Sequence, residues 1–327
     1  MNHVVSNEGA TSPIKEEVAK KGNWWKVVRS HFRRLPLEIL NLFFNYDWLF
    51  WLIGAINKHV GLIESVFLVY PASEKYALAY VYRHRLPKVK WNPWPCGALW
   101  QNGKLSLMFC ISATNGQYSD PKNAENLRQV SERMEKLRQL FGANRKTFAG
   151  VLPGVLYFKR VIRDAPEADL TAMAVAQAID SVKSRELLDA KTPVVILGGK
   201  GFIGRRVMKL LDKSIAHSID SADGQGQKDW PIQSMGQRVI VVNITLNNAI
   251  RDYLEVIQPG TVVINEVYPE PAPDVLERLT SRGCQCYHIV GVKAFSLPPF
   301  PEAYKGAIPC CAAWPSPKMK VVVRKLN

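Results

Sequence analysis

The sequence has few cysteines and lacks the spacing that would place them around a metal or in a disulfide framework. Six cysteines are scattered over 327 residues. Cys284 and Cys286 are separated by one residue, with neither a second pair at zinc-finger spacing nor neighbouring histidines. Structural zinc sites need such spacing, and disulfide scaffolds are short, cysteine-dense chains. We therefore expect reduced thiols in a cytosolic protein, and no metal site.

Acidic residues are also scarce, since 28 aspartates and glutamates face 43 lysines and arginines and the net charge is +15. A basic surface attracts anions such as nucleotide phosphates, anionic lipids or acidic carrier proteins. No recognisable nucleic-acid-binding module accompanies this charge, so we expect no nucleic acid as a partner. The N-terminus lacks the basic-then-apolar layout of a secretory signal, which favours a cytoplasmic protein.

The N-terminal part of the chain changes character twice. Residues 1–21 are polar without apolar periodicity, which predicts a flexible tail. Residues 22–63 form an aromatic amphipathic segment that joins a basic stretch to a very apolar one. The apolar stretch 37–56 approaches the length of a membrane span, but polar residues interrupt it: Glu38, Asn41, Asn45 and Asp47. Such groups are costly in hydrocarbon, so a spanning helix ranks behind two other interpretations.

Those two interpretations are a helix lying in a membrane interface and a protein-packing surface. An interfacial helix would place tryptophans at the headgroups and basic side chains against anionic lipid: Trp24, Trp25, Trp48 and Trp51, with Lys26, Arg29, Arg33 and Arg34. In the other interpretation, the aromatic residues pack on the first domain or across a homo-oligomer interface. Peripheral contact at the inner face of a membrane and protein packing both stay open.

Strand-like and helix-like patterns alternate over the rest of the chain, which predicts an α/β fold. Asn102-Gly103 separates two apolar runs and predicts a β-hairpin. Apolar residues at spacings of three and four predict a helix over 123–140, and a short buried strand is predicted to end at Pro153-Gly154. We expect an α/β substrate domain over 64–168 and a dinucleotide-binding domain over 169–327.

The stretch "VVILGGKGFIGRR" carries a G-x-G-x-x-G pattern between an apolar strand and a helix. In such a connection one glycine permits a tight turn, the next lets the main chain approach a pyrophosphate, and the third lets helix and strand pack closely. The predicted cofactor-binding turn contains Gly199, Gly201, Phe202, Ile203 and Gly204. A glycine-rich turn without a ligand is the alternative.

An acidic residue after the next strand favours NAD over NADP as the cofactor. Asp220 lies about 20 residues beyond the first glycine of the pattern, where a carboxylate binds the ribose hydroxyls. Asp223 is a competing candidate. Arg205 and Arg206 lie nearby and could instead meet a ribose phosphate, so NADP stays open.

The later strands and helices predict a Rossmann-like, doubly wound sheet, abridged because the stretch after the second strand shows neither a helix nor a third strand. Ligands of such sheets lie beyond the carboxyl ends of the strands. This rule makes Asn243 and Thr245 cofactor-binding candidates. It also makes Glu266 a candidate general acid or base, if its surroundings raise its pKa. Tyr268 and residues 292–295 complete the predicted rim.

A helix-like segment, 170–188, directly before the dinucleotide-binding unit resembles the arrangement in two-domain amino-acid-dehydrogenase-like enzymes. This group includes shikimate dehydrogenase, methylenetetrahydrofolate dehydrogenase and glutamyl-tRNA reductase. The resemblance covers about residues 66–292. It implies an NAD(P)-dependent oxidoreductase with a catalytic cleft between two domains. The Lys and Asp pair that shikimate dehydrogenase needs has no match here.

Four segments also resemble parts of long-chain acyl-(acyl carrier protein) reductase: LIESVFL, FAGVLPGVLYF, VVINEVYPEP and IPCCAAW. The last resemblance implies a catalytic cysteine at Cys310, with Cys311 as the alternative. A thiolate there would attack an acyl thioester, and hydride from a nicotinamide would reduce the enzyme-bound acyl group to an aldehyde. A thiol needs a nearby cation or helix terminus to become that thiolate, and Lys305 is close in sequence. Buried, inert cysteines are the other interpretation.

Lys159 is a further catalytic candidate, against the alternative of an ordinary surface lysine. His217 and His288 lie in apolar, strand-like runs and are interpreted as core residues. These observations predict an NAD(P)-dependent oxidoreductase whose small-molecule substrate is apolar or an acyl compound. Because the sequence secures no catalytic acid, base or nucleophile, a non-catalytic, membrane-associated nucleotide-binding regulatory protein is the alternative.

Overall fold

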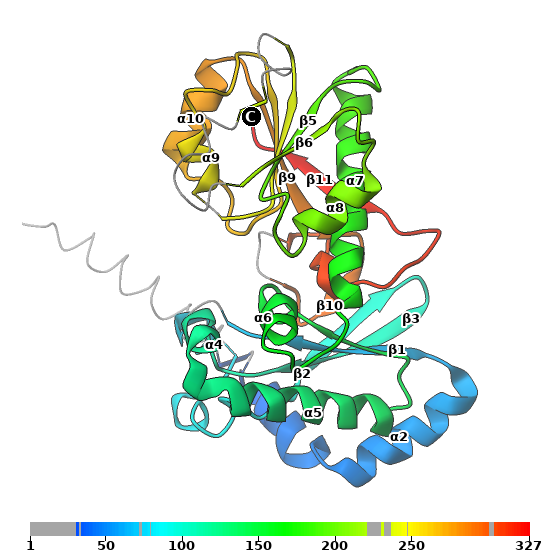
Figure 1. Ribbon diagram of the computed structural model, residues 1–327. Coiled ribbons are helices and arrows are strands. Elements are labelled where there is room, and N and C mark those ends of the chain that lie inside the picture. The colour runs from blue at the N-terminus through cyan, green and yellow to red at the C-terminus, as the bar shows by residue number, and fades with distance from the viewer. Residues whose placement is uncertain are drawn as a thin grey trace, which may run out of the picture.

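The structure is a computed structural model that describes residues 31–32, 34–71, 74–78, 80–220, 230–231, 237–246, 248–300 and 304–327. The predicted tail, 1–21, lies outside these ranges. The described residues form a mixed α/β structure with two β-sheets, one in each of two lobes (Figure 1). The first half of the chain builds the lower lobe of Figure 1, and most of the second half builds the upper lobe.

The first sheet combines strands from the first half of the chain with one distant strand. Its order is β10 (Phe295–Leu297), β2 (Trp94–Gln101), β3 (Lys104–Cys110), β1 (Ile63–Val69) and β4 (Arg145–Phe148). β1 is parallel to β3 and β4, whereas β2 is antiparallel to β3 and β10. The predicted hairpin is confirmed between β2 and β3, where Asn102 and Gly103 both have positive φ.

Helices cover this sheet with their apolar faces. α2 (Asp47–Val60) and α5 (Ala124–Leu140) pack on it through Phe50 and Leu137, in a core that includes Val66. The helix predicted over 123–140 is therefore confirmed as α5. Other helical segments of this lobe are the helix Arg34–Phe44, α3 (Glu74–Ala77), η1 (Arg83–Arg85), α4 (Asn115–Ser119), η2 (Pro121–Asn123) and α6 (Leu152–Phe158).

The strand predicted to end at Pro153-Gly154 is wrong in its extent. β4 ends at Phe148, and α6 begins at Leu152 with Pro153 in its first turn. Proline suits a first helical turn, because its missing N–H would have no helical partner there. Gly150, at a φ of 54°, reverses the chain between the two elements. The apolar run after Gly150 therefore belongs to a helix.

The second sheet contains six strands in the described residues. Its order is β11 (Val321–Lys325), β9 (Gln285–Val292), β8 (Val262–Asn265), β7 (Ile240–Asn243), β5 (Val194–Leu197) and β6 (Ala216–Ile219). The strands from β9 to β6 are parallel, and β11 is antiparallel to β9. The chain runs outward from β5 in both directions, so the strand order reverses between β5 and β7.

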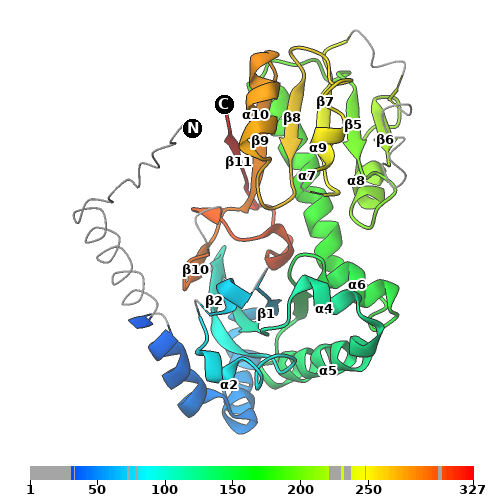
Figure 2. The same cartoon turned by 90° about the vertical axis from the view of Figure 1, so that its left-hand side faces the viewer.

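Helices lie on both faces of the second sheet (Figure 2). α7 (Pro166–Arg185) and α8 (Gly204–Leu210) pack on the face that carries Ile196. α9 (Ala249–Asp252) and α10 (Pro273–Ser281) pack on the face that carries Val195. Every residue of β5, β7 and β8 is buried. Burial on both faces explains why these strands are continuous apolar runs in the sequence.

The chain path differs from a simple division at residue 168. β10 lies in the first sheet, although 169–327 was expected to form the dinucleotide-binding domain alone. Pairing with β10 satisfies the outer edge of β2, which would otherwise expose unpaired main-chain groups. In the part of the chain that the structure describes, β6 is an edge strand, and most of the segment 221–237 lies outside that part.

Candidate cofactor and catalytic site

The glycine turn joins β5 to α8 and leaves no room for side chains at three glycines. A Cβ on Gly204 would lie 2.0 Å from the carbonyl oxygen of Gly198, and one on Gly199 would lie 2.3 Å from Ser218 Oγ. Gly198 has a φ of 92°, and a Cβ there would lie 2.7 Å from Thr245 Cβ. The bare main chain of this turn therefore packs against β6 and the loop after β7, at the point where the strand order reverses.

The other residues of the turn have different surroundings. Gly201 is exposed, whereas Ile203 packs against the core between the sheet and α7. The ring of Phe202 lies 5.4 Å from the ring of Tyr157 and 5.7 Å from that of Phe158, both on α6. The turn is thus in direct contact with the first lobe.

Asp220 follows β6 and holds the turn from the side. Its Oδ1 accepts a hydrogen bond from the main-chain N–H of Lys200 at 2.9 Å, and its Oδ2 accepts one from the Ser218 hydroxyl at 2.9 Å. A carboxylate has about four acceptor positions, so both oxygens keep capacity for further donors. Asp223, the competing candidate, lies outside the described residues.

The two arginines after the glycine pattern have different roles. Arg206 forms an ion pair with Asp169 of α7 at 2.8 Å and donates to the Phe202 carbonyl at 2.9 Å. Its guanidinium also lies 4.3 Å from the centre of the Phe202 ring. These contacts fix Arg206 between α7 and α8, whereas Arg205 is exposed.

Buried amides connect the carboxyl ends of β7 and β8 to β9. Asn243 Nδ2 donates to Asn265 Oδ1 at 2.9 Å, and Asn265 Nδ2 lies 3.1 Å from His288 Nδ1. Asn243 Oδ1 also accepts from the Thr245 N–H at 3.3 Å. Burial lowers the pKa of His288, so a neutral ring accepts the amide proton. Asn243 is fully buried within this hydrogen-bond network at the carboxyl edge of the sheet, while Thr245 is half-buried.

Glu266 comes directly after β8 and faces a cluster at the junction of the two lobes. Burial raises the pKa of its carboxyl to about 7. None of the described side chains donates a hydrogen bond to this carboxyl. Its charge raises the pKa values of Cys310, Cys311 and Tyr304, which places these three groups within its electrostatic reach.

The two cysteines lie in η5 (Cys310–Ala312), a short segment that contacts α7 and β4. Cys310 is 8% exposed, and burial raises its pKa well above the ordinary value, with further increases from Glu266 and Cys311. Burial raises the pKa of Cys311 to about 12. Both thiols are therefore held protonated, which is the opposite of the activation that the resemblance implies for Cys310. Lys305 is exposed.

The first lobe and the start of α7 contribute Tyr70 and Glu167 to this junction. The Tyr70 hydroxyl accepts from the Val151 N–H at 3.1 Å, and burial raises the pKa of Tyr70 to about 12, with a contribution from Cys311. Glu167 is 1% exposed, accepts from the Phe148 N–H at 3.3 Å, and has a pKa that burial raises to about 7.

The sequence did not identify Glu167, because an acidic residue just after a helix-starting proline is typical of a solvated first turn. Lys159, which the sequence did identify, is half-buried at the end of α6, directly after Phe158. Neither an ion pair nor a side-chain hydrogen bond joins it to another described residue. His217 is half-buried on β6.

An apolar cavity of about 160 Å³ lies at the carboxyl ends of β1 and β3. Its walls include Val69, Tyr70, Val81, Cys96, Met108 and Phe300. Apolar cavities of about 150 Å³ stay dry and take up a group the size of benzene. Tyr70 lines this cavity and also lies within electrostatic reach of Cys311. The cavity therefore offers space for an apolar group of a ligand beside the junction of the two lobes.

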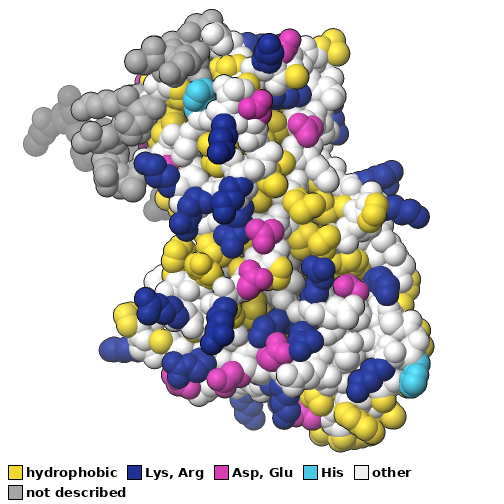
Figure 3. Space-filling view, turned by 45° about the vertical axis from the view of Figure 1, so that its right-hand side comes forward, with side chains coloured by type: hydrophobic (Ala, Val, Ile, Leu, Met, Phe, Trp, Pro, Cys, Tyr) yellow, Lys and Arg dark blue, Asp and Glu magenta, His cyan; other side chains and the backbone are white. Residues whose placement is uncertain are grey.

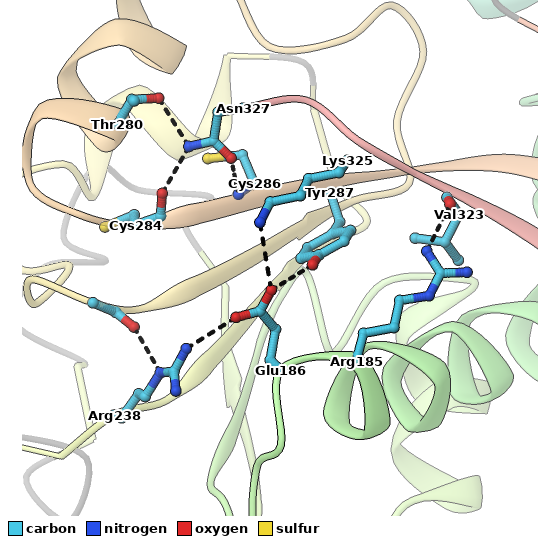
Figure 4. Close-up of polar contacts among 11 residues, drawn as sticks. Arg185, Glu186, Arg238, Thr280, Cys284, Cys286, Tyr287, Val323, Lys325 and Asn327 are labelled. Carbon is cyan, nitrogen blue, oxygen red and sulfur yellow. Dashed lines mark hydrogen bonds and ion pairs between the residues drawn. The ribbon is translucent and has the colours of Figure 1, made fainter.

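A second polar cluster, near the amino ends of β7 and β9, surrounds the carboxylate of Glu186 (Figure 4). Glu186, at the end of α7, accepts a hydrogen bond from the Tyr287 hydroxyl at 2.5 Å and lies 3.1 Å from Arg238 and 3.7 Å from Lys325. Its charge is matched by two cations, and the cluster ties α7 to the sheet. None of the described residues forms such an ion pair with Glu266, so the two carboxylates are suited to different tasks.

Among the described residues, no group of three or more His, Cys, Asp or Glu side chains could hold a metal ion.

No protein-family model matches the chain, and no curated protein matches it significantly.

Proposed function

We propose that the protein is an NAD(P)(H)-dependent oxidoreductase that acts on an apolar carbonyl or hydroxyl compound at the junction of its two lobes. The observation that carries this proposal is the glycine turn, in which a Cβ on Gly204 would lie 2.0 Å from the Gly198 carbonyl oxygen. Such a turn, at the reversal point of a doubly wound sheet, is the place where Rossmann-like domains receive a pyrophosphate.

The residues around the turn fit a dinucleotide. The main chain at Gly199 and Gly201 would hold the pyrophosphate, and Asp220 would accept hydrogen bonds from the ribose hydroxyls. A carboxylate there repels a ribose phosphate, and Arg206 is engaged with Asp169, so NAD(H) is favoured over NADP(H). The bound nicotinamide supplies or accepts hydride.

Glu266 is the proposed proton donor and acceptor. With a pKa of about 7, its carboxyl is present in both protonation states at neutral pH, which is the condition that favours general acid–base catalysis. The protonated form gives its proton to the substrate oxygen during reduction, and the charged form takes it back during oxidation. We assign no covalent step to Cys310 or Cys311, because both thiols are held protonated.

The cavity beside Tyr70 supports an apolar substrate. Its walls are almost entirely hydrocarbon and aromatic surface, and its size suits a short alkyl chain or an aromatic ring. An acyl chain remains a member of this substrate class, with its reactive carbon at the junction.

The test is cofactor binding followed by turnover with purified protein. We expect NADH fluorescence to change on binding, with weaker binding of NADPH, and NADH to be consumed with short-chain aliphatic or aromatic aldehydes or ketones. Failure to bind either cofactor would overturn the proposal. Binding without turnover of any carbonyl, hydroxyl, acyl or imine compound would favour the non-catalytic regulatory protein, a reading supported by the protonated cysteines.

A further inference from the structure

The N-terminal helices expose an unusual amount of apolar surface. Of the 23 exposed large hydrophobic side chains among the described residues, 12 lie between Phe32 and Val60. Trp48 is 65% exposed and Trp51 is 62% exposed. Figure 3 shows hydrophobic side chains gathered at the lower end of the molecule, the end at which α2 lies in Figure 1. Apolar surface concentrated in this way marks an interaction site.

α2 is apolar on two opposite faces, and described residues cover only one of them. Phe50 and Gly54 face inward, where Phe50 packs on Phe141 with ring centres 4.7 Å apart and a Cβ on Gly54 would lie 1.8 Å from the Leu140 carbonyl oxygen. Asn57 continues this inner face and donates to the Phe141 carbonyl at 3.0 Å. The helix is therefore fixed to α5, and its outer apolar face cannot rotate inward.

The preceding helix, Arg34–Phe44, has the same two-faced character. Leu37 is 7% exposed and packs in the first lobe, and Asn41 Nδ2 donates to the Pro95 carbonyl at 2.9 Å. Ile39 and Phe43 are exposed. This helix and α2 meet at an angle of 87°, and no single helix of the described residues is long and apolar enough to cross a membrane.

The charges on the helix Arg34–Phe44 and on α2 indicate which kind of partner would bind their apolar surface. Between Arg34 and Val60 the sequence has two carboxylates. Glu38 pairs with Arg85 at 2.6 Å, and Asp47 pairs with Arg133 and Lys136, both at 2.7 Å.

Basic side chains lie at the margins of the same surface. Lys58 is exposed at the end of α2, and Arg83 and Lys88 are exposed in the segment that contacts the preceding helix through Arg85. Lys26, Arg29 and Arg33, which the sequence adds, lie outside the described residues, as do Trp24 and Trp25.

We propose that the helix Arg34–Phe44 and α2 form a docking surface for an anionic lipid membrane, with Trp48 and Trp51 at the headgroup level and Phe43 at the boundary with the acyl chains. Tryptophan and tyrosine favour this level because each has an apolar body and a polar tip, and exposed lysines and arginines gain attraction from anionic lipid. A second copy of the chain would bring more basic side chains to this surface, where both carboxylates already have partners. Lipid phosphates match the charge, and a second copy does not.

The experiment is co-sedimentation of the full chain with vesicles of phosphatidylcholine, with and without phosphatidylglycerol. We expect binding to the anionic vesicles that weakens as salt is raised. The triple variant Phe43→Ser, Trp48→Ser, Trp51→Ser should bind at least about tenfold more weakly, because full burial of even one large apolar side chain contributes about this factor. Leu187→Ser, at a leucine that is 92% exposed in the other lobe, is the matched control and should bind like the wild type.

A second variant tests the contribution of a basic side chain to vesicle binding, and two further measurements test whether the variants are folded. Lys58→Glu should weaken binding to anionic vesicles only, and circular dichroism with thermal unfolding should show that both variants keep the wild-type fold. Failure of the wild type to bind anionic vesicles would overturn the proposal, as would equal binding to neutral vesicles. A wild-type dimer in light scattering that the triple variant converts to monomer would assign the surface to a second copy instead.

Discussion

Gly204 lies so close to Gly198 that a Cβ on Gly204 would be 2.0 Å from the Gly198 carbonyl oxygen. The atom in the way is main chain, so no side-chain rotation can relieve the contact. We expect Gly204→Ala to lower the free energy of unfolding by about 1–3 kcal/mol, the usual cost of overpacking. Urea unfolding measures this change.

Gly116→Ala is the matched control, because a Cβ at Gly116 would have no neighbour within 4 Å. It should leave the free energy of unfolding near the wild-type value. Equal stabilities of the two variants would contradict the packing described for the turn.

Asp220→Asn tests the choice of cofactor. The amide oxygen can still accept from the Lys200 N–H, so the turn keeps its support, but the charge that favours ribose hydroxyls and repels a ribose phosphate is lost. We expect NADH affinity to fall about tenfold, since hydrogen bonds to charged groups contribute about 1.5–3 kcal/mol, and the preference over NADPH to narrow. Fluorescence titration measures both affinities. Asp180→Asn removes the same charge from an exposed site on α7 and should change neither.

Glu266→Gln tests the proton-transfer role. In the wild type, the protonated form is lost as pH rises through about 7, so the reduction rate should fall over that range and the oxidation rate should rise. The variant cannot exchange a proton, so we expect this pH dependence to disappear and kcat to fall by about 10²–10⁴-fold. NADH affinity should stay unchanged. A variant with the wild-type pH profile would show that another group exchanges the proton.

Glu167→Gln tests the cost of burying a carboxyl group. Burial raises the pKa of Glu167 from 4.5 to about 7, so the folded protein binds this proton more tightly than the unfolded chain does. Stability therefore falls as pH rises from about 4.5 to about 7. Glutamine keeps an acceptor for the Phe148 N–H without this cost. We expect the variant to be about 1–3 kcal/mol more stable than the wild type at pH 8, with no gain at pH 4, as measured by urea unfolding at both values.

The parts of the fold that were predictable from sequence depend on neighbouring residues. The hairpin at Asn102 and Gly103 needs two adjacent residues that tolerate positive φ, and both are visible in the sequence. β5, the glycine turn and α8 likewise form one continuous pattern over 194–210, and the strand before Asp220 follows from its own apolar residues.

The features that were not predictable depend on residues far apart in the chain. β10 is only three residues long, and what makes it a strand is the free edge of β2. The burial of Glu167 is set by β4 and η5, not by its helix. The high pKa values of Cys310 and Cys311 arise in the same way, because the sequence names both thiols and Glu266 but does not reveal that the fold buries the thiols and places them near that carboxyl.

The crossing of β10 into the first sheet also affects how the protein can be divided. Residues 1–168 expressed alone would lack the strand that pairs with Leu99 and Trp100, and β2 would become an exposed edge that invites aggregation. Residues 169–327 expressed alone would contain β10 without β2, the strand with which it pairs. Neither lobe is a contiguous module, so a soluble fragment for binding studies requires a circular permutation or a linker that joins 295–297 to the first lobe, not a cut between α6 and α7.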